Sequence, residues 1–146
     1  MITEISNLVE ENPQGYYSLV IGSDSQTKTV AGKPQIDFVT AIVVYRRGNG
    51  ARYFWKKEKV ARKPILRDKI YTETMRSLET AQELVPELTK AMGKSKYDLE
   101  IHIDVGQVGK TRDMIKEVVG MVTGSGYVAK TKPDSWAASS VADKHT

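Results

Sequence analysis

The most informative stretch of this chain is Ser18-Leu19-Val20-Ile21-Gly22-Ser23-Asp24-Ser25-Gln26. Its apolar and β-branched residues predict a strand, with Leu19 and Ile21 on one face and Asp24 on the other. A carboxylate at the end of a buried strand is costly unless a cation compensates its charge, and a metal ion is one such cation. The alternative is a turn that ends the strand, because small polar residues after a glycine also suit turns.

A second stretch, Tyr97 to Asp104, alternates apolar and polar residues and also ends in a carboxylate. Asp24 and Asp104 would therefore stand at matching ends of two strands. If those strands are parallel neighbours, both carboxylates lie in one site, where they repel each other unless a cation sits between them. Oxygen ligands of this kind select a hard cation such as Mg²⁺ or Mn²⁺.

The rest of the chain predicts an α/β domain with a mixed five-stranded sheet and flanking helices. Apolar periodicity and turn residues indicate strands at 16–23, 36–46, 51–60, 97–104 and 127–130. Helices are expected at 65–92, 111–123 and 135–146, with Pro86 kinking or breaking the first of them. The first three strands indicate an antiparallel meander, and the strand-helix-strand steps that follow imply parallel pairing. Residues 1–15 are expected to form a short N-terminal helix, and 16–146 a single domain.

Helical phase selects a third carboxylate. On the 65–92 helix, Glu73 lies about 70° from the centre of the apolar face, while Glu79 lies nearly opposite it and Glu83 also suits a solvated position. Glu73 is thus the glutamate able to point toward the sheet. A fourth candidate is Asp143 near the end of the chain. Asp134 competes with it, but Asp134 suits the N-cap or first turn of the last helix.

The composition of the chain excludes several classes of functional site. The chain of 146 residues contains no Cys, which excludes disulfide-linked partners, thiolate zinc sites and a Cys nucleophile. His102 and His145 offer little for a histidine-based site, and His102 is expected to be a buried structural residue. No apolar run approaches the roughly 20 residues of a membrane helix, and the acidic N-terminus is unlike a signal peptide. A cytoplasmic protein without membrane contact is therefore expected.

Positive charge is concentrated in one part of the chain. The segment from Arg46 to Arg76 holds eleven Lys/Arg against three Asp/Glu, whereas the whole chain carries a net charge of +4. Aromatic residues are interleaved there. Such a segment is the usual electrostatic mark of a phosphate-rich partner, the alternative being ordinary solvated surface. The residues expected to bind a nucleic-acid substrate are Lys56, Lys57, Arg62, Lys63 and Lys132.

The order of the elements and the positions of the acids resemble the ribonuclease H-like superfamily. The strings IGSDSQ, IHIDVGQVGKT, GYVAKTKP and ASSVADKHT are similar, more narrowly, to the YkuK-type bacterial family, whose function is unassigned. The resemblance covers most of the chain. It implies a ribonuclease H-like fold with a two-metal nuclease site on Asp24, Glu73, Asp104 and Asp143, and it favours Asp143 over Asp134.

These observations predict a divalent-metal-dependent nuclease that hydrolyses RNA, RNA·DNA hybrid or structured DNA with two Mg²⁺ or Mn²⁺ ions. Asp24 would bridge both ions, with Glu73 and Asp104 on one ion and Asp143 on the other. One alternative is a non-catalytic nucleic-acid-binding module on the same fold. A weaker one compares IGSDSQT with the phosphate loop of actin- and sugar-kinase-like ATPases, which need two lobes where this chain supplies one.

Overall fold

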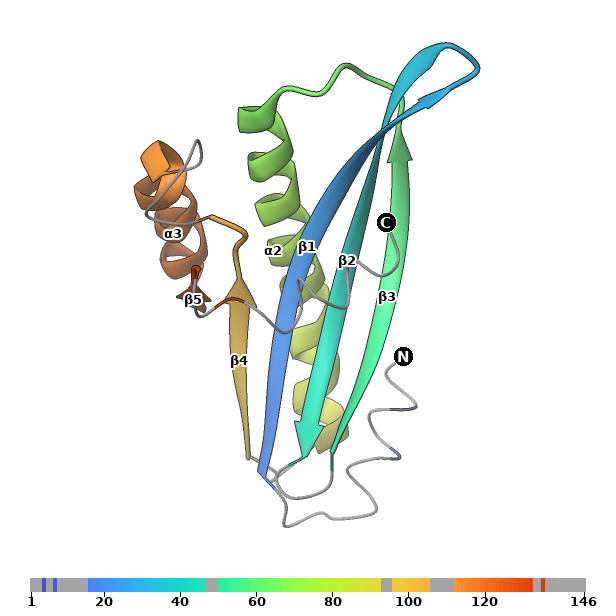
Figure 1. Ribbon diagram of the computed structural model, residues 1–146. Coiled ribbons are helices and arrows are strands. Elements are labelled where there is room, and N and C mark those ends of the chain that lie inside the picture. The colour runs from blue at the N-terminus through green and yellow to red at the C-terminus, as the bar shows by residue number, and fades with distance from the viewer. Residues whose placement is uncertain are drawn as a thin grey trace.

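The computed structural model describes residues 4, 7, 16–46, 50–92, 96–105, 112–132 and 135. Within these ranges the chain forms one five-stranded sheet in the order β3-β2-β1-β4-β5 (Figure 1). Its strands are β1 (Tyr16–Val30), β2 (Lys33–Arg46), β3 (Ala51–Val60), β4 (Lys96–His102) and β5 (Val128–Lys130). Strand β2 is antiparallel to β1 and β3, whereas β4 is parallel to β1 and β5. The predicted α/β class and mixed sheet are confirmed.

The hairpin of β1 and β2 is longer than the sequence predicts. The first strand is predicted to end at Ser23, but β1 continues through Asp24 to Val30. The two residues between the strands, Ala31 and Gly32, have φ angles of 53° and 76°. Positive φ at both central positions gives a turn whose twist matches that of the paired strands. The alternative of a strand-ending turn at the first aspartate is therefore wrong.

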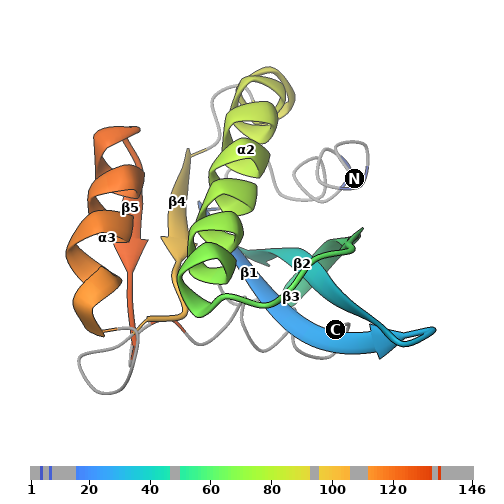
Figure 2. The same ribbon diagram turned by 90° about the horizontal axis from the view of Figure 1, so that it is seen from above.

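Helix α2 (Leu66–Met92) lies along the sheet (Figures 1 and 2). It continues through Pro86 to its end, so the prediction of a break there is wrong. The carbonyl that loses its donor to the proline ring belongs to Gln82, and both side chains are exposed, so water can bond this carbonyl instead. The buried apolar side chains of α2 recur mostly every three or four residues from its second turn onward: Ile70, Leu78, Ala81, Leu84 and Leu88.

The helix predicted at 111–123 is present in two parts. A 3₁₀ turn, η1 (Arg112–Met114), leads directly into α3 (Ile115–Gly124). Helix α3 lies at the β4–β5 end of the sheet (Figures 1 and 2). Its buried Val118 and Val122 belong to the same core as the inward side of α2. The two helices therefore close one apolar core on the sheet.

Polar residues join the apolar ones on the buried side of α2 toward its N-terminal half. Leu84 and Leu88 are buried toward the C-terminal end, Ser77 supplies a buried hydroxyl in the middle, and Glu73 lies one turn before it. Buried polar side chains thus accompany the apolar core toward the end of the sheet where the β1–β2 hairpin projects (Figure 1). This end contains the residues that the sequence singles out for chemistry.

Two predicted elements fall mostly outside the described residues. Of the expected N-terminal helix the structure describes Glu4 and Asn7, both helical. Of the last helix it describes Ser135, whose side chain is buried. The division into 1–15 and 16–146 stays a prediction. No helix in the described ranges is long and apolar enough to cross a membrane.

Candidate functional site

The pairing of β1 with β4 brings two aspartates together. The last residue pair of this parallel ladder is Gly22 with His102, and Asp24 and Asp104 each follow two residues later. The two strands are adjacent and parallel, as predicted, and the two aspartates lie beside each other. Their expected position at matching strand ends is wrong, because Asp24 lies in the middle of β1 and Asp104 lies past the end of β4.

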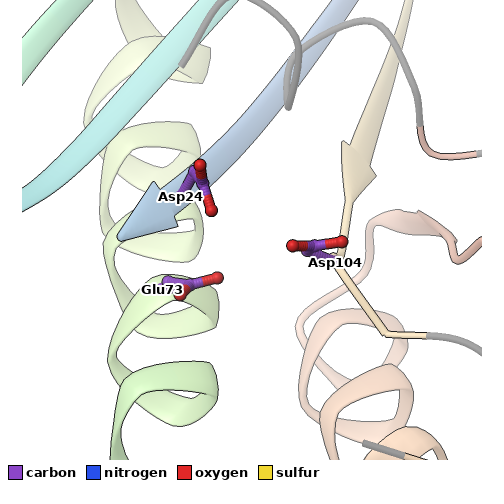
Figure 3. A group of neighbouring side chains, drawn as sticks. All are labelled: Asp24, Glu73 and Asp104. Atoms are coloured by element: carbon purple, nitrogen blue, oxygen red, sulfur yellow. The ribbon is translucent and has the colours of Figure 1, made fainter. Parts of the chain in front are cut away.

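Helix α2 adds Glu73 to this pair. One ligand oxygen from each of Asp24, Glu73 and Asp104 lies within 4.8 Å of the others. Figure 3 shows the three carboxylates turned toward one another beyond the end of β4. Glu73 is buried, while the two aspartates are partly exposed. We refer to these three residues as the acidic triad.

The environment of Glu73 disfavours its charge. The pKa of Glu73 is raised to about 8, chiefly by burial and also by the charges of Asp24 and Asp104, although a hydrogen bond from Ser25 lowers it. Ser25 Oγ donates this bond to Glu73 Oε2 over 2.5 Å. Without a cation, the triad therefore keeps a proton on Glu73 at neutral pH.

The helical phase argument distinguishes the two glutamates correctly. Glu73 lies in the acidic triad, whereas Glu79 is partly exposed and its Oε2 is 3.3 Å from Arg76 Nη1. Arg76 also pairs with Glu58 on β3, its Nε lying 2.5 Å from Oε2. Glu79 thus belongs to an ion-pair group between α2 and β3, away from the triad. Asp143 and its rival Asp134 lie outside the described residues.

Lys132 is the predicted substrate-binding residue that touches the triad. Its Nζ lies 2.7 Å from Asp104 Oδ1. The hydrogen bond and charge of Asp104 raise the pKa of Lys132, with smaller contributions from Asp24 and Glu73. Asp104 is therefore the carboxylate that chiefly favours the charged form of this lysine.

The other predicted substrate-binding cations belong to β3 and to the connection that follows it. Lys56 and Lys57 are on β3, and the Nζ of Lys57 is 3.5 Å from Asp37 Oδ2 on β2. Arg62 and Lys63 lie in the exposed connection to α2, where Arg62 Nη2 donates a 3.0 Å hydrogen bond to Thr72 Oγ1. Four of the five cations thus belong to β3 or the segment that follows it.

A buried hydroxyl network supports the triad, and sequence reasoning missed it. Ser23 Oγ lies 2.9 Å from Thr40 Oγ1 of β2 and 2.9 Å from Ser77 Oγ of α2. Together with the bond between Ser25 and Glu73, it ties β1 to α2 on both sides of Asp24. The available signal was the alternation Ser-Asp-Ser, which puts both serines on the face opposite to the aspartate.

Two other features do not belong to this site. His102 is buried, as expected, with Nε2 3.3 Å from Glu100 Oε2. A cavity of about 620 Å³ lies between β3 and α2, where its lining includes Ile42, Phe54 and Leu84. The triad residues are not among the residues that line this cavity. Chemistry based on the carboxylates is therefore separate from it.

The triad has the composition of a site for a hard divalent cation. All three donors are carboxylates, the ligand type that Mg²⁺ and Mn²⁺ prefer. The pKa of Glu73 is raised chiefly by burial and further by the charges of the two aspartates, and a cation among the three carboxylates would offset both effects. The side chains that the structure describes therefore fit a metal ion.

A sheet of this order, with a helix that directs a glutamate toward one aspartate on β1 and another just past the end of β4, defines the ribonuclease H-like class of fold. The chain belongs to the ribonuclease H-like family, whose model matches residues 1–146. Its sequence is 36% identical to the uncharacterized protein YkuK of Bacillus subtilis (strain 168), over 157 aligned positions that cover all of this chain and 88% of YkuK. The predicted YkuK-type, ribonuclease H-like family is confirmed.

The crystal structure of NurA is similar in part. The match has a TM-score of 0.35 and 10% sequence identity, and it covers 69% of this chain. This chain spans only about a quarter of the NurA chain, with 26% of it matched. At this level of similarity the match carries no argument about function.

Proposed function

We propose that this protein hydrolyses phosphodiester bonds of nucleic acids in a reaction that requires a divalent cation. The observation that carries the proposal is the convergence of Asp24, Glu73 and Asp104, from three elements, to within 4.8 Å. Membership of the ribonuclease H-like family adds support, because it gives these residues a nuclease-type fold. The proposed substrate is RNA, RNA·DNA hybrid or structured DNA.

In the proposed reaction a water molecule gives up a proton as its oxygen forms a bond to phosphorus, the bond from phosphorus to the leaving sugar oxygen breaks, and that leaving oxygen takes up a proton. A bound Mg²⁺ or Mn²⁺ would supply water activation and charge neutralisation. Asp24, Glu73 and Asp104 would hold such an ion, and the hydrogen bond from Ser25 orients the carboxylate of Glu73. The resemblance adds Asp143 and a second ion, and both stay predictions.

Substrate affinity is proposed to come from the cations outside the triad. Lys56, Arg62, Lys63 and Lys132 are exposed and so accessible to a phosphate backbone. Positive side chains bind nucleic acid mainly through phosphate contacts, which makes the affinity depend on salt. Binding and cleavage would therefore rest on different residues and can be separated by substitution.

The test is a pair of assays on the wild-type protein and on Asp24→Asn. With Mg²⁺ or Mn²⁺, the wild type is expected to cut at least one of hybrid, single-stranded and branched substrates. Asp24→Asn should lose more than about 100-fold in cleavage rate, because asparagine keeps the shape and removes the charge that a metal ligand supplies. Its affinity for nucleic acid should stay the same or improve, since a carboxylate near the phosphates is removed.

The matched control is Asp98→Asn, an exposed aspartate on β4 outside the triad, which should cleave like the wild type. If the wild type binds several substrates tightly but cleaves none with either metal, the protein is a nucleic-acid-binding module and the proposal of an enzyme is wrong.

A further inference from the structure

Strand β3 presents different side chains on its two faces. Phe54 packs against the core shared with α2, and Glu58 pairs with Arg76 of that helix, so the even-numbered residues of β3 face α2. The odd-numbered residues therefore face the other side of the sheet. On that side β3 carries, in succession, two aromatic residues and two lysines: Tyr53, Trp55, Lys57 and Lys59. We refer to these four residues as the aromatic–lysine row.

Both aromatic side chains of this row are accessible to solvent. Tyr53 is 49% exposed and Trp55 is 47% exposed. Successive side chains on one face of a strand are about 7 Å apart, so the two residues occupy neighbouring positions. They lie at the edge of the sheet, where β3 is the outermost strand (Figure 1). Two aromatic rings are thus accessible side by side on an edge strand.

The lysines add positive charge to the same face. Lys57 Nζ lies 3.5 Å from Asp37 Oδ2 on β2, and Lys28 Nζ on β1 lies 2.8 Å from the same oxygen. Asp37 is buried and pairs across the ladder with Lys59, which is exposed. Three lysines thus accompany one buried carboxylate here. The excess positive charge attracts phosphate groups.

This face of the sheet also carries Asp24 of the triad. Asp24 pairs with Val39 of β2, and Val39 pairs with Lys57, so the three residues form one line across three strands. Directly opposite residues in such ladders have their side chains on the same face. Adjacent strands are about 4.8 Å apart, so the backbones of Asp24 and Lys57 are separated by about 10 Å. A nucleic acid bound along β3 would therefore flank the triad.

We propose that the aromatic–lysine row binds a single-stranded segment of the substrate next to the cleaved bond, with bases stacked on its aromatic rings and phosphates bound by its lysines. This inference rests on the proposed function and deepens it, because it selects single-stranded over fully paired nucleic acid. Aromatic side chains beside positive charge suit single strands, since every base has a face that can stack. In a duplex the bases stack on one another and do not reach the rings of a protein.

The first experiment measures binding without cleavage. A labelled single-stranded oligonucleotide, and the same oligonucleotide annealed to its complement, are titrated with the full chain in the presence of chelator. The wild type should bind the single strand at least about tenfold more tightly than the duplex. Trp55→Ala should lose about tenfold in affinity for the single strand, the effect of one stacked base, and Trp55→Phe should retain most of it. The matched control Val128→Ala, an exposed apolar residue on the opposite edge strand β5, should bind like the wild type.

The lysines are tested through the salt dependence of the same affinity. Lys59→Gln should lower the slope of log affinity against log salt concentration by about 1, because one phosphate contact is lost. Lys90→Gln, an exposed lysine near the end of α2, should leave the slope unchanged. An unchanged slope for Lys59→Gln would show that the phosphates do not lie on this face.

Tryptophan fluorescence tests the stacking contact while Trp55 itself stays in place. The chain contains two tryptophans, so Trp136→Phe leaves Trp55 as the only one. The fluorescence of Trp55 should be quenched by the single strand and not by the duplex.

Equal affinity for single strand and duplex, unquenched Trp55 fluorescence, or a folded Trp55→Ala within twofold of the wild type would overturn this inference. The proposed function would then still stand if the wild type cleaves nucleic acid with Mn²⁺. A wild type that neither binds nor cleaves any of the substrates would overturn both.

Discussion

Replacing Glu73 by glutamine should stabilise the metal-free protein, and the gain should grow with pH. The pKa of Glu73 is raised from its ordinary value of 4.5 to about 8, chiefly by burial. Between these two values the folded protein keeps a proton that the unfolded chain releases. Stability therefore falls as pH rises through this window, since the unfolded state binds fewer protons. The full shift corresponds to at most about 5 kcal/mol.

We expect about 2 to 4 kcal/mol of this effect, because solvent at the edge of the triad screens part of it. The assay is urea unfolding at half-unit steps from pH 5 to 9, with a chelator present throughout. Wild-type stability should fall over this range relative to Glu73→Gln, which has no group to titrate at that position. Glu87→Gln, an exposed glutamate on the same helix, should follow the wild type.

The same proton should compete with metal. Below pH 8, the Mn²⁺ affinity of the wild type should weaken by about tenfold for each unit that the pH falls, because the ion must displace the proton of Glu73. Parallel stability curves for wild type and Glu73→Gln from pH 5 to 8, together with pH-independent Mn²⁺ affinity, would refute the reasoning. They would show that Glu73 is ionised in the folded protein despite its burial.

Three further predictions concern charge and hydrogen bonding elsewhere. The pKa of buried Asp37 is lowered to about 2, chiefly by the hydrogen bond from Lys28, so about 2 kcal/mol of stability, present above pH 4, should be lost as pH falls toward 2. The urea midpoints of Asp37→Asn should lack this loss. Ser77→Ala should cost about 1 to 2 kcal/mol by leaving the hydroxyl network incomplete, whereas Thr89→Ala, on the exposed side of α2, should change the urea midpoint little. Replacing the four predicted cations Lys56, Lys57, Arg62 and Lys63 by glutamine should flatten the slope of log affinity against log salt concentration by up to about 3. An unchanged slope would mean that nucleic acid binds to another surface.

The sequence predicts the sheet and the identity of the triad because both depend on local periodicity. Alternation in 97–104 puts Ile101 in the core and Asp104 on the other side, and the spacing of apolar residues on the long helix separates Glu73 from Glu79. These predictions need only that each element be regular. The structure then brings the carboxylates together through the parallel pairing of β1 and β4.

Features that depend on tertiary contacts could not be predicted in this way. The second half of β1 has few apolar residues, and it is a strand because it pairs with β2 as far as Val30 and Lys33. The hydrogen bond from Ser25 to Glu73 depends on how closely α2 packs on the sheet, and the spacing of apolar residues does not determine that distance. The contact between Lys132 and Asp104 likewise requires the β4–β5 register.

The two neighbours of β1 differ greatly in their distance along the chain, which has a consequence for the kinetics of folding. β2 follows β1 after two residues, so this hairpin closes a very short loop. Asp24 and Asp104 are 80 positions apart, and the β1–β4 ladder closes a loop of that length, which is slow to form. If the triad forms after the rate-limiting barrier, a divalent ion that binds it would slow the unfolding rate and leave the folding rate nearly unchanged. The protein would then resist proteolysis for longer in millimolar Mg²⁺ than in chelator, and its refolding rate would be the same in both.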